Sequence, residues 1–177
     1  SFFPIPHLEI ENTISKFKNK KIQLNSKRIK IYPKIKDIYS YKKFEINKIK
    51  LLDSELIIDQ KFFKNFIKNI FTLEKQFLFE DLSIKILDNE NPIIEFNDVK
   101  YTNYGLNKDF ITGIILGREF EIDFKNNKKI NLELLNTGIS AVWTLQEPTN
   151  SFIKKGNFKG KILKSNLNLD FSYNIET

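Results

Sequence analysis

Apolar and polar residues alternate along much of this chain, most regularly near its C-terminus. From Leu167 to Tyr173 every second residue is apolar, and the residues between them are Asn, Asp or Ser. The same alternation occurs over residues 120–125 and 130–134. A period of two places alternate side chains on opposite faces of a β-strand. Repeated in strand after strand, it predicts an antiparallel sheet with one apolar face and one polar face.

The alternation divides the chain into many short strands. We expect strands over residues 8–11, 22–32 and 44–58; the second changes phase and the third breaks near Asp53, as a bulge or bend would cause. Further strands are expected over residues 78–87, 92–101, 110–116, 119–125, 129–135, 139–146, 157–163 and 166–175. Asn, Gly and Pro mark the turns, and no linker is long enough to force two domains. The sequence therefore predicts a single, mainly β domain over residues 1–177.

One segment, at about residues 60–73, breaks the β pattern. Its apolar residues recur with the spacing of one stripe of a helix, and Lys and Asn take the opposite face. Asp59 is the expected N-cap, because a side-chain oxygen there accepts a hydrogen bond from a free N–H of the first turn. We expect this amphipathic helix to cap one end of the apolar face with Phe62, Phe66 and Ile70.

The composition is that of a folded domain with many basic residues. The 177 residues are 41% hydrophobic and 29% charged, and the 17 Phe supply ample apolar surface for a core. The formal net charge is +7, and basic stretches lie at residues 16–21 and 27–43. We interpret these stretches first as solvated faces and second as surface attracted to anionic headgroups. Aromatic residues lie nearby, but no RNP or KH motif is present, so nucleic acid is not an expected partner.

The sequence contains no recognisable catalytic constellation. His7 is the only histidine and cysteine is absent, so a triad, thiolate chemistry and a Cys-based zinc site lack their components. The acidic residues at Glu80-Asp81 and between Asp88 and Glu90 flank strands, where solvated carboxylates are expected. We therefore expect a protein that is not an enzyme and has no metal site and no cofactor. Its function would then depend on the apolar face.

The chain has no methionine and begins with Ser1. We therefore expect a piece excised from a longer, membrane-anchored chain, with the anchor before Ser1. No apolar run in the sequence reaches the roughly 18 residues that a membrane-spanning helix needs.

The order of the N-terminal elements resembles a known family. A Phe- and Pro-containing segment leads into the first strand, Phe3-Pro4-Ile5-Pro6-His7-Leu8-Glu9-Ile10-Glu11-Asn12. There follow a strand over residues 22–32, a connection over 33–41, a strand pair over 44–58 that ends in a polar residue before a helix, a strand over 92–99, and hairpins with Gly between them. This order resembles the N-terminal region of the AsmA-like family of bacterial envelope proteins, which includes TamB-type bridge-like lipid transport proteins.

The resemblance implies a curved antiparallel sheet that forms an open apolar groove. It implies an inner-membrane-anchored protein that faces the periplasm and shields phospholipid acyl chains for intermembrane lipid transport and outer-membrane assembly. The implied partners are a phospholipid or another acyl lipid, a membrane reached through a segment outside this chain, and envelope proteins. The expected groove residues are the apolar phase of the strands: Leu82, Ile84, Ile86, Ile94, Phe96, Phe120, Ile122, Phe124, Ile130, Leu132, Leu134, Leu167, Leu169, Phe171 and Tyr173. Trp143 is expected on the same face.

Other classes of protein fit the same alternation. The apolar face would equally form the dry core of a closed β-sandwich, which would make the chain a non-enzymatic interaction module. A lipopolysaccharide-transport-type β-jellyroll shelters acyl chains by similar physics, although the helix within the sheet argues against it. A β domain that binds nucleic acid is a further alternative, and steep salt dependence of oligonucleotide binding would support it.

Overall fold

The structure is a computed structural model that describes residues 6–17, 21–34, 45–71, 74–125, 128–146 and 153–174, without the side chains of residues 64, 67–71, 125, 153–154 and 173–174. The chain divides into two compact units, residues 1–108 (unit 1) and 109–177 (unit 2). Both are mainly β, as predicted, and in each the strands follow one another across the sheet in chain order. The expectation of a single domain over residues 1–177 stays a prediction.

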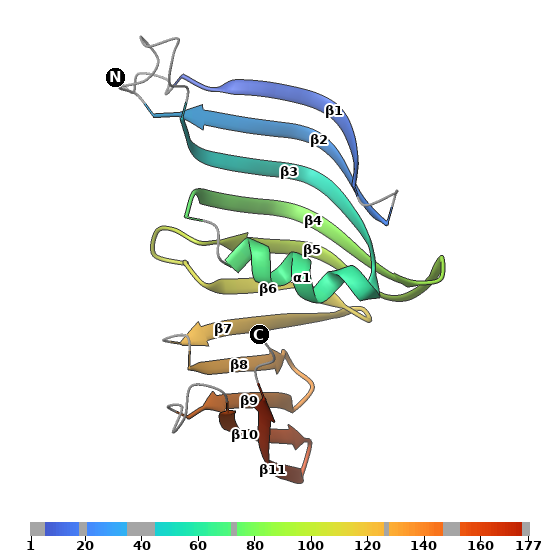
Figure 1. Ribbon diagram of the computed structural model, residues 1–177. Coiled ribbons are helices and arrows are strands. Elements are labelled where there is room, and N and C mark those ends of the chain that lie inside the picture. Colours follow the sequence, from blue (N-terminus) through green and yellow to red (C-terminus); the bar gives the residue numbers. More distant parts are fainter. Residues whose placement is uncertain are drawn as a thin grey trace. The chain divides into compact units, whose positions relative to one another are not determined.

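The described residues of unit 1 form five strands and one helix (Figure 1). These are β1 (Leu8–Phe17), β2 (Ile22–Pro33), β3 (Ile46–Asp59), α1 (Gln60–Phe71), β4 (Gln76–Asp88) and β5 (Asn91–Thr102). The pairs β1–β2, β2–β3 and β4–β5 are antiparallel, whereas β3 and β4 run parallel. The expectation of a wholly antiparallel sheet is therefore wrong at β3–β4. A parallel pair needs a crossover connection, and α1 provides it.

The helix begins where the sequence predicts. Asp59 Oδ1 accepts a hydrogen bond from the Lys61 backbone N–H at 3.0 Å, which confirms Asp59 as the N-cap. The helix contacts β3 and β4 and lies in front of the strands in Figure 1. Phe62 and Phe66 are half-buried, and the side chain of Ile70 lies outside the described residues. The helix thus joins two parallel strands, and its role as a cap on a groove stays a prediction.

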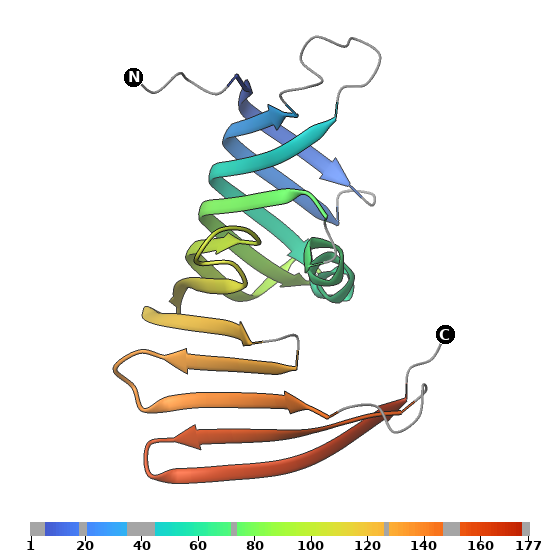
Figure 2. The same ribbon diagram turned by 90° about the vertical axis from the view of Figure 1, so that its left-hand side faces the viewer.

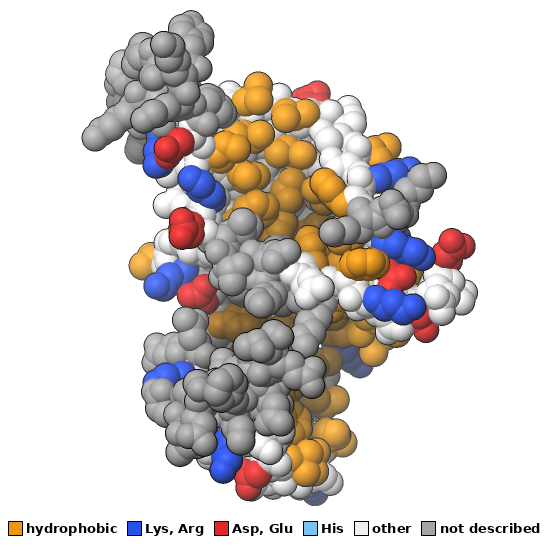
Figure 3. All heavy atoms as spheres, in the orientation of Figure 1, with side chains coloured by type: hydrophobic (Ala, Val, Ile, Leu, Met, Phe, Trp, Pro, Cys, Tyr) orange, Lys and Arg blue, Asp and Glu red, His pale blue; other side chains and the backbone are white. Residues whose placement is uncertain are grey.

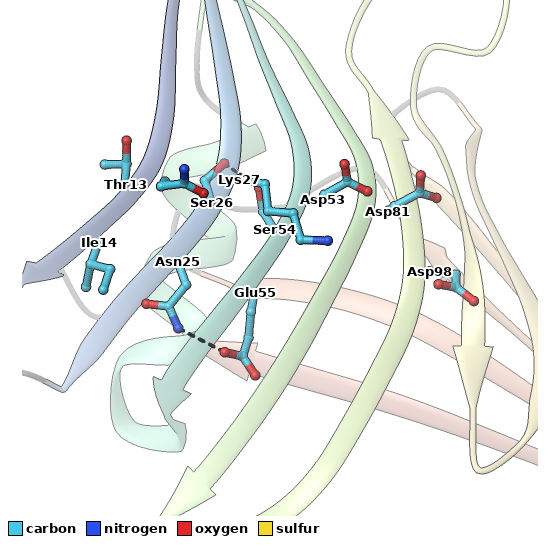
Figure 4. A pocket seen from close by; sticks show the side chains of 11 residues that line it. Thr13, Ile14, Asn25, Ser26, Lys27, Asp53, Ser54, Glu55, Asp81 and Asp98 are labelled. Carbon is cyan, nitrogen blue, oxygen red and sulfur yellow. Dashed lines mark hydrogen bonds between the residues drawn. The ribbon is translucent and has the colours of Figure 1, made fainter.

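Four residues with a left-handed backbone conformation form a line across the sheet of unit 1. Asn12, Asp53, Asp81 and Asp98, on β1, β3, β4 and β5, have φ angles of 50°, 48°, 55° and 51°. The first three lie at matching levels, and Asp98 adjoins Val99, which pairs with Leu82 next to Asp81. We call this line the crease (Figure 4). Asn and Asp are the non-glycine residues that tolerate this conformation best, because their short side chains bond locally. Each of these residues shifts the alternation by one position, so the break expected at Asp53 is part of a feature that spans the sheet.

The alternation of apolar and polar residues changes phase at the crease. Because of this change, the apolar residues on both sides of the crease lie on the same face of the sheet in unit 1. They form rows across the strands, of which one is Ile10, Ile29, Leu51, Phe79 and Tyr101, and another is Phe17, Ile22, Ile58, Ile86 and Ile94. The row beside the crease instead begins with three hydroxyl residues, Thr13, Ser26 and Ser54. The buried core lies on this face at β3, β4 and β5, where Leu56 and Ile58 are almost fully buried.

Unit 2 is an antiparallel meander of six strands (Figure 2). The strands are β6 (Phe110–Ile115), β7 (Arg118–Lys125), β8 (Lys129–Leu134), β9 (Ile139–Leu145), β10 (Ile153–Ile162) and β11 (Ser165–Asn174). Gly117 and Gly138 sit in turns at φ angles of 72° and 71°, where a residue with a Cβ would be strained. No left-handed residue lies inside the described strands of this unit, so its alternation continues without a shift of phase.

Candidate functional site

The candidate site begins with the apolar face of unit 2. Three rows cross its strands, and we call them the aromatic row, the middle row and the branched row. The aromatic row is Phe124, Ile130, Trp143, Phe158 and Leu169; the middle row is Ile122, Leu132, Ala141, Gly160 and Leu167; the branched row is Phe120, Leu134, Ile139 and Ile162. The structure therefore brings together the groove residues that the alternation predicts on β7 and β8, and Leu167 and Leu169 of β11. It also places Trp143 on this face, as expected.

This face is only partly shielded from solvent. Phe120 is buried, with 4% of its surface exposed, whereas Leu167 and Leu169 are each 51% exposed. The other apolar residues of the three rows are half-buried, apart from the exposed Ile162. The described residues of unit 2 form one sheet, and among them no second layer packs on this face. In the described part of this unit the apolar face is therefore not the core of a closed sandwich.

Two aromatic side chains fill positions beside glycines on the same face. The Phe171 ring lies over Gly156 of the neighbouring strand, and the Phe158 ring lies against Gly160. The rings of Trp143 and Phe158 lie 4.9 Å apart between their centroids. Phe171 is half-buried, and the side chain of Tyr173 lies outside the described residues.

The apolar face of unit 1 changes from buried to exposed across the sheet. Leu82 and Ile86 are 2% and 8% exposed, so they belong to the core beside α1 and are not accessible to a ligand. Ile84, Ile94 and Phe96 are half-buried. The most exposed residues of this face are Leu8, Ile10 and Phe17 on β1, which are 53%, 39% and 54% exposed. Figure 3 shows hydrophobic side chains gathered over this part of the sheet.

Sequence reasoning missed several residues of both faces. Tyr101 shares a face with Phe96 only because Asp98 shifts the phase of β5 between them. Ala141 and Gly160 of the middle row are too small to mark a phase, although their pairing with Leu132 and Leu167 places them on the apolar face.

The polar face of unit 1 carries a hydrogen-bonded network. Gln23 Nε2 donates to Asn25 Oδ1 at 2.9 Å, Asn25 Nδ2 donates to Glu55 Oε2 at 2.9 Å, and Lys85 Nζ donates to Glu55 Oε1 at 2.7 Å. The hydrogen bond from Lys85, with that from Asn25, lowers the pKa of Glu55. The hydrogen bond to Glu55 and the charge of Glu55, with that of Glu95, raise the pKa of Lys85. Both shifts favour the ionised forms of Glu55 and Lys85 at neutral pH.

A polar cavity of about 530 Å³ lies at the crease. Its acidic residues include Asp53, Asp81 and Asp98, on neighbouring strands in Figure 4. Arg28 Nη2 lies 3.3 Å from an oxygen of Asp53, and Lys100 Nζ lies 3.9 Å from Asp81. Among the described residues, no group of three or more His, Asp or Glu side chains is arranged to hold a metal ion. Asp53 and Asp81 are therefore positions of left-handed backbone with basic neighbours.

His7 packs against neighbouring side chains at one end of unit 1. Its ring stacks on Tyr32 with centroids 5.1 Å apart, and its Nε2 lies 3.5 Å from Glu9. Lys48 lies over the rings of Tyr32 and Tyr104, at 5.2 Å and 4.6 Å from their centroids. These contacts tie β1, β2, β3 and the end of β5 together at one end of unit 1.

Comparison with protein-family models, with curated proteins and with solved structures found no match for this chain. In the part of the chain that the structure describes, no helix has both the length and the apolar character needed to cross a membrane.

Proposed function

We propose that this chain shelters the acyl chains of lipids on its apolar faces and takes part in lipid transport between bacterial membranes. The observation that supports this most directly is the apolar face of unit 2, where Leu167 and Leu169 are half-exposed and no second layer of described residues in the unit covers the three rows. Large exposed apolar patches are rare on soluble proteins and mark sites that bind a partner or a lipid.

Burial of methylene groups provides the driving force. Each CH₂ kept from water contributes about 0.8 kcal/mol, so a lipid with two acyl chains gains from any continuous apolar surface. This attraction has no preferred direction. A face made of aligned rows therefore attracts acyl chains along its whole extent, and many residues share the binding energy.

The resemblance to the AsmA-like family extends the proposal. On that basis we place the chain in the bacterial envelope, as the periplasm-facing part of an inner-membrane-anchored protein that is not an enzyme. Its partners would be phospholipids and envelope proteins. The β3–α1–β4 crossover supports this assignment over a lipopolysaccharide-transport-type jellyroll, because the latter normally has no helix inside its sheet.

A protein-interaction module is the second candidate. The burial of Leu56 and Ile58 shows that part of the apolar face of unit 1 already serves as a core. If a partner protein covers the face of unit 2 in the same way, the chain binds a protein there and carries no lipid.

Native mass spectrometry of the chain purified from bacterial cells without detergent tests the proposal. The test variant combines Ile122→Asp and Phe124→Asp, which place two charges on the apolar face of β7. The matched control combines Asn131→Asp and Thr144→Asp, which add the same charge on the polar face of β8 and β9. Circular dichroism establishes that both variants are folded.

We expect phospholipid to accompany the wild type and the control and to be lost from the test variant. A lipid-free wild type, or a folded test variant that keeps its lipid, contradicts the proposal. A stoichiometric protein partner on the lipid-free wild type would support the interaction module.

A further inference from the structure

The middle row of unit 2 contains a gap in its side chains. Ala141 of β9 pairs with Gly160 of β10, so two neighbouring strands present almost no side chain at this level. The aromatic row rises on one side, with Trp143 and Phe158, and the branched row rises on the other. The result is an apolar cavity of about 240 Å³, which we call the notch. It is lined by Ile139, Ala141, Phe158, Gly160, Ile162 and Leu167, with the polar residues Ser140, Lys161, Ser165 and Asn166 at its margin.

Gly160 is not required here by the backbone conformation. Its φ lies outside the left-handed region, unlike those of Gly117 and Gly138. A Cβ on Gly160 would lie 3.2 Å from Phe158 Cε1 and 3.7 Å from Leu167 Cβ, inside the space that the notch occupies. Glycine inside a strand weakens it and often marks a site where a ligand or another backbone approaches closely. The small residue therefore provides room on the face.

We propose that the notch seats one unbranched alkyl chain of an anionic lipid, which crosses β9 and β10 between the aromatic row and the branched row. This inference rests on the proposed function and specifies it. The gap is a single row wide, which suits a linear chain and excludes a bulky ring system. No acidic residue lines the notch, and Lys164 lies in the adjacent β10–β11 turn. Lys161 also lines the notch, but it pairs with Ser140, so its side chain belongs to the polar face. The positive charge of Lys164 favours a carboxylate or phosphate headgroup.

Trp143 provides the measurement, because it is the only tryptophan of the chain and stands beside the notch. The probe is 11-bromoundecanoic acid, whose bromine quenches tryptophan fluorescence at short range. The comparison probe is 3-bromoadamantane-1-carboxylic acid, which carries the same bromine and carboxylate on a compact cage. The two probes differ in shape, so a preference between them reports the width of the site.

Three variants accompany the wild type. Ala141→Leu fills the notch, and Gly160→Ala adds one methyl group against the flexible end of the Phe158 ring. Thr144→Leu is the matched control, because it adds a similar side chain to β9 on the opposite face, where Thr144 pairs with Asn157. Thermal unfolding followed by circular dichroism shows that each variant is folded. If Ala141→Leu fails to fold, Gly160→Ala carries the test.

We expect the linear acid to quench Trp143 with a dissociation constant about tenfold lower than that of the cage acid, since the extra methylenes that fit the notch contribute about a factor of ten. Ala141→Leu should lose this advantage, Gly160→Ala should lose part of it, and Thr144→Leu should keep it. Equal binding of the two acids, or unchanged binding of the linear acid to folded Ala141→Leu, overturns the inference about the notch.

The proposed function is judged separately. If phospholipid accompanies the purified wild type while the notch variants have no effect, the acyl chains lie elsewhere on the face and only the notch is wrong. If the wild type is lipid-free and neither acid quenches Trp143, both proposals fail.

Discussion

Ser26 Oγ and Ser54 Oγ lie 2.7 Å apart on neighbouring strands at the crease of unit 1, and both side chains are buried. Ser26 Oγ also lies 3.1 Å from the Arg28 carbonyl oxygen, and Ser54 Oγ lies 3.2 Å from the Leu52 carbonyl oxygen. The crease interrupts the regular ladder at this level. The two hydroxyls have one hydrogen each for these three contacts, so they donate to two of the three acceptors at a time. This pair is therefore a structural part of the crease, although it lies within an apolar face.

Removing one of these hydroxyls should destabilise unit 1. We expect Ser54→Ala to lower the free energy of unfolding by about 1–2 kcal/mol, since it leaves buried polar groups without a partner. Ser26→Ala should have a similar effect, and the double variant should cost less than the sum of the two because they share one hydrogen bond. Urea denaturation of the four proteins measures this cycle. Strict additivity would show that the two hydroxyls act independently.

The left-handed backbone conformation at the crease leads to a second prediction, which concerns the stability of Asp98 variants. Asp98 is exposed and has a φ of 51°, which costs a β-branched residue roughly 1–2 kcal/mol. We expect Asp98→Gly to keep wild-type stability and Asp98→Val to lose about that amount, measured by urea denaturation. Asn97→Val, one residue earlier on the same strand, is the control and should be tolerated. Equal stability of Asp98→Val and Asp98→Gly would show that the crease does not depend on this conformation.

The two units differ in how much of their structure the sequence predicts. In unit 2 the alternation is unbroken, so the shared face of Ile122, Leu132 and Leu167 follows from a period of two. In unit 1 the strands change phase at the crease, and only the pairing shows that Asp53 and Asp81 lie side by side. A single break looks like an isolated bulge until its neighbours on adjacent strands are known.

The candidate site shows the same difference. The large apolar residues of unit 2 could be assigned to one face from the sequence, because a large apolar side chain indicates which face of the strand its position belongs to. Ala141 and Gly160 are too small to give this indication. The helix around Phe62 was recognisable from its apolar stripe, and Asp59 from its capping chemistry. That α1 joins parallel strands was not, because local sequence carries no information on the direction of the next strand.

The Glu55–Lys85 ion pair gives the stability of unit 1 a pH dependence. The pKa of Glu55 is lowered in the folded state by the hydrogen bonds from Lys85 and Asn25, so its contribution is present above the ordinary glutamate pKa of about 4.3 and is lost as the pH falls through the lowered value. The pKa of Lys85 is raised, so its contribution is present below about 10.4 and is lost as the pH rises through the raised value.

Glu55→Gln should therefore reduce stability between about pH 5 and pH 10 and have little effect at pH 3. Because both side chains are about one-third exposed, we expect a loss of only about 0.2–1 kcal/mol at pH 7, and less at high salt. Thermal unfolding across this pH range measures the difference. Glu90→Gln, an exposed residue in the β4–β5 turn, is the control. A difference between Glu55→Gln and wild type that persists undiminished at pH 3 would assign the effect to packing instead of charge.

The glycines of β10 should respond differently to the same substitution. A Cβ on Gly156 would lie 2.7 Å from the Thr144 carbonyl oxygen and 2.9 Å from Phe171 Cε2, whereas a Cβ on Gly160 meets only side-chain atoms, the nearest at 3.2 Å. A backbone oxygen of a paired strand cannot move away as a ring can.

We expect Gly156→Ala to destabilise unit 2 by about 1–3 kcal/mol and Gly160→Ala by clearly less. Adding Phe171→Leu to Gly156→Ala should recover only part of the loss, because the contact with Thr144 persists. Urea denaturation of these variants makes the comparison, and equal stability of Gly156→Ala and Gly160→Ala would mean that β9 and β10 separate easily at this level.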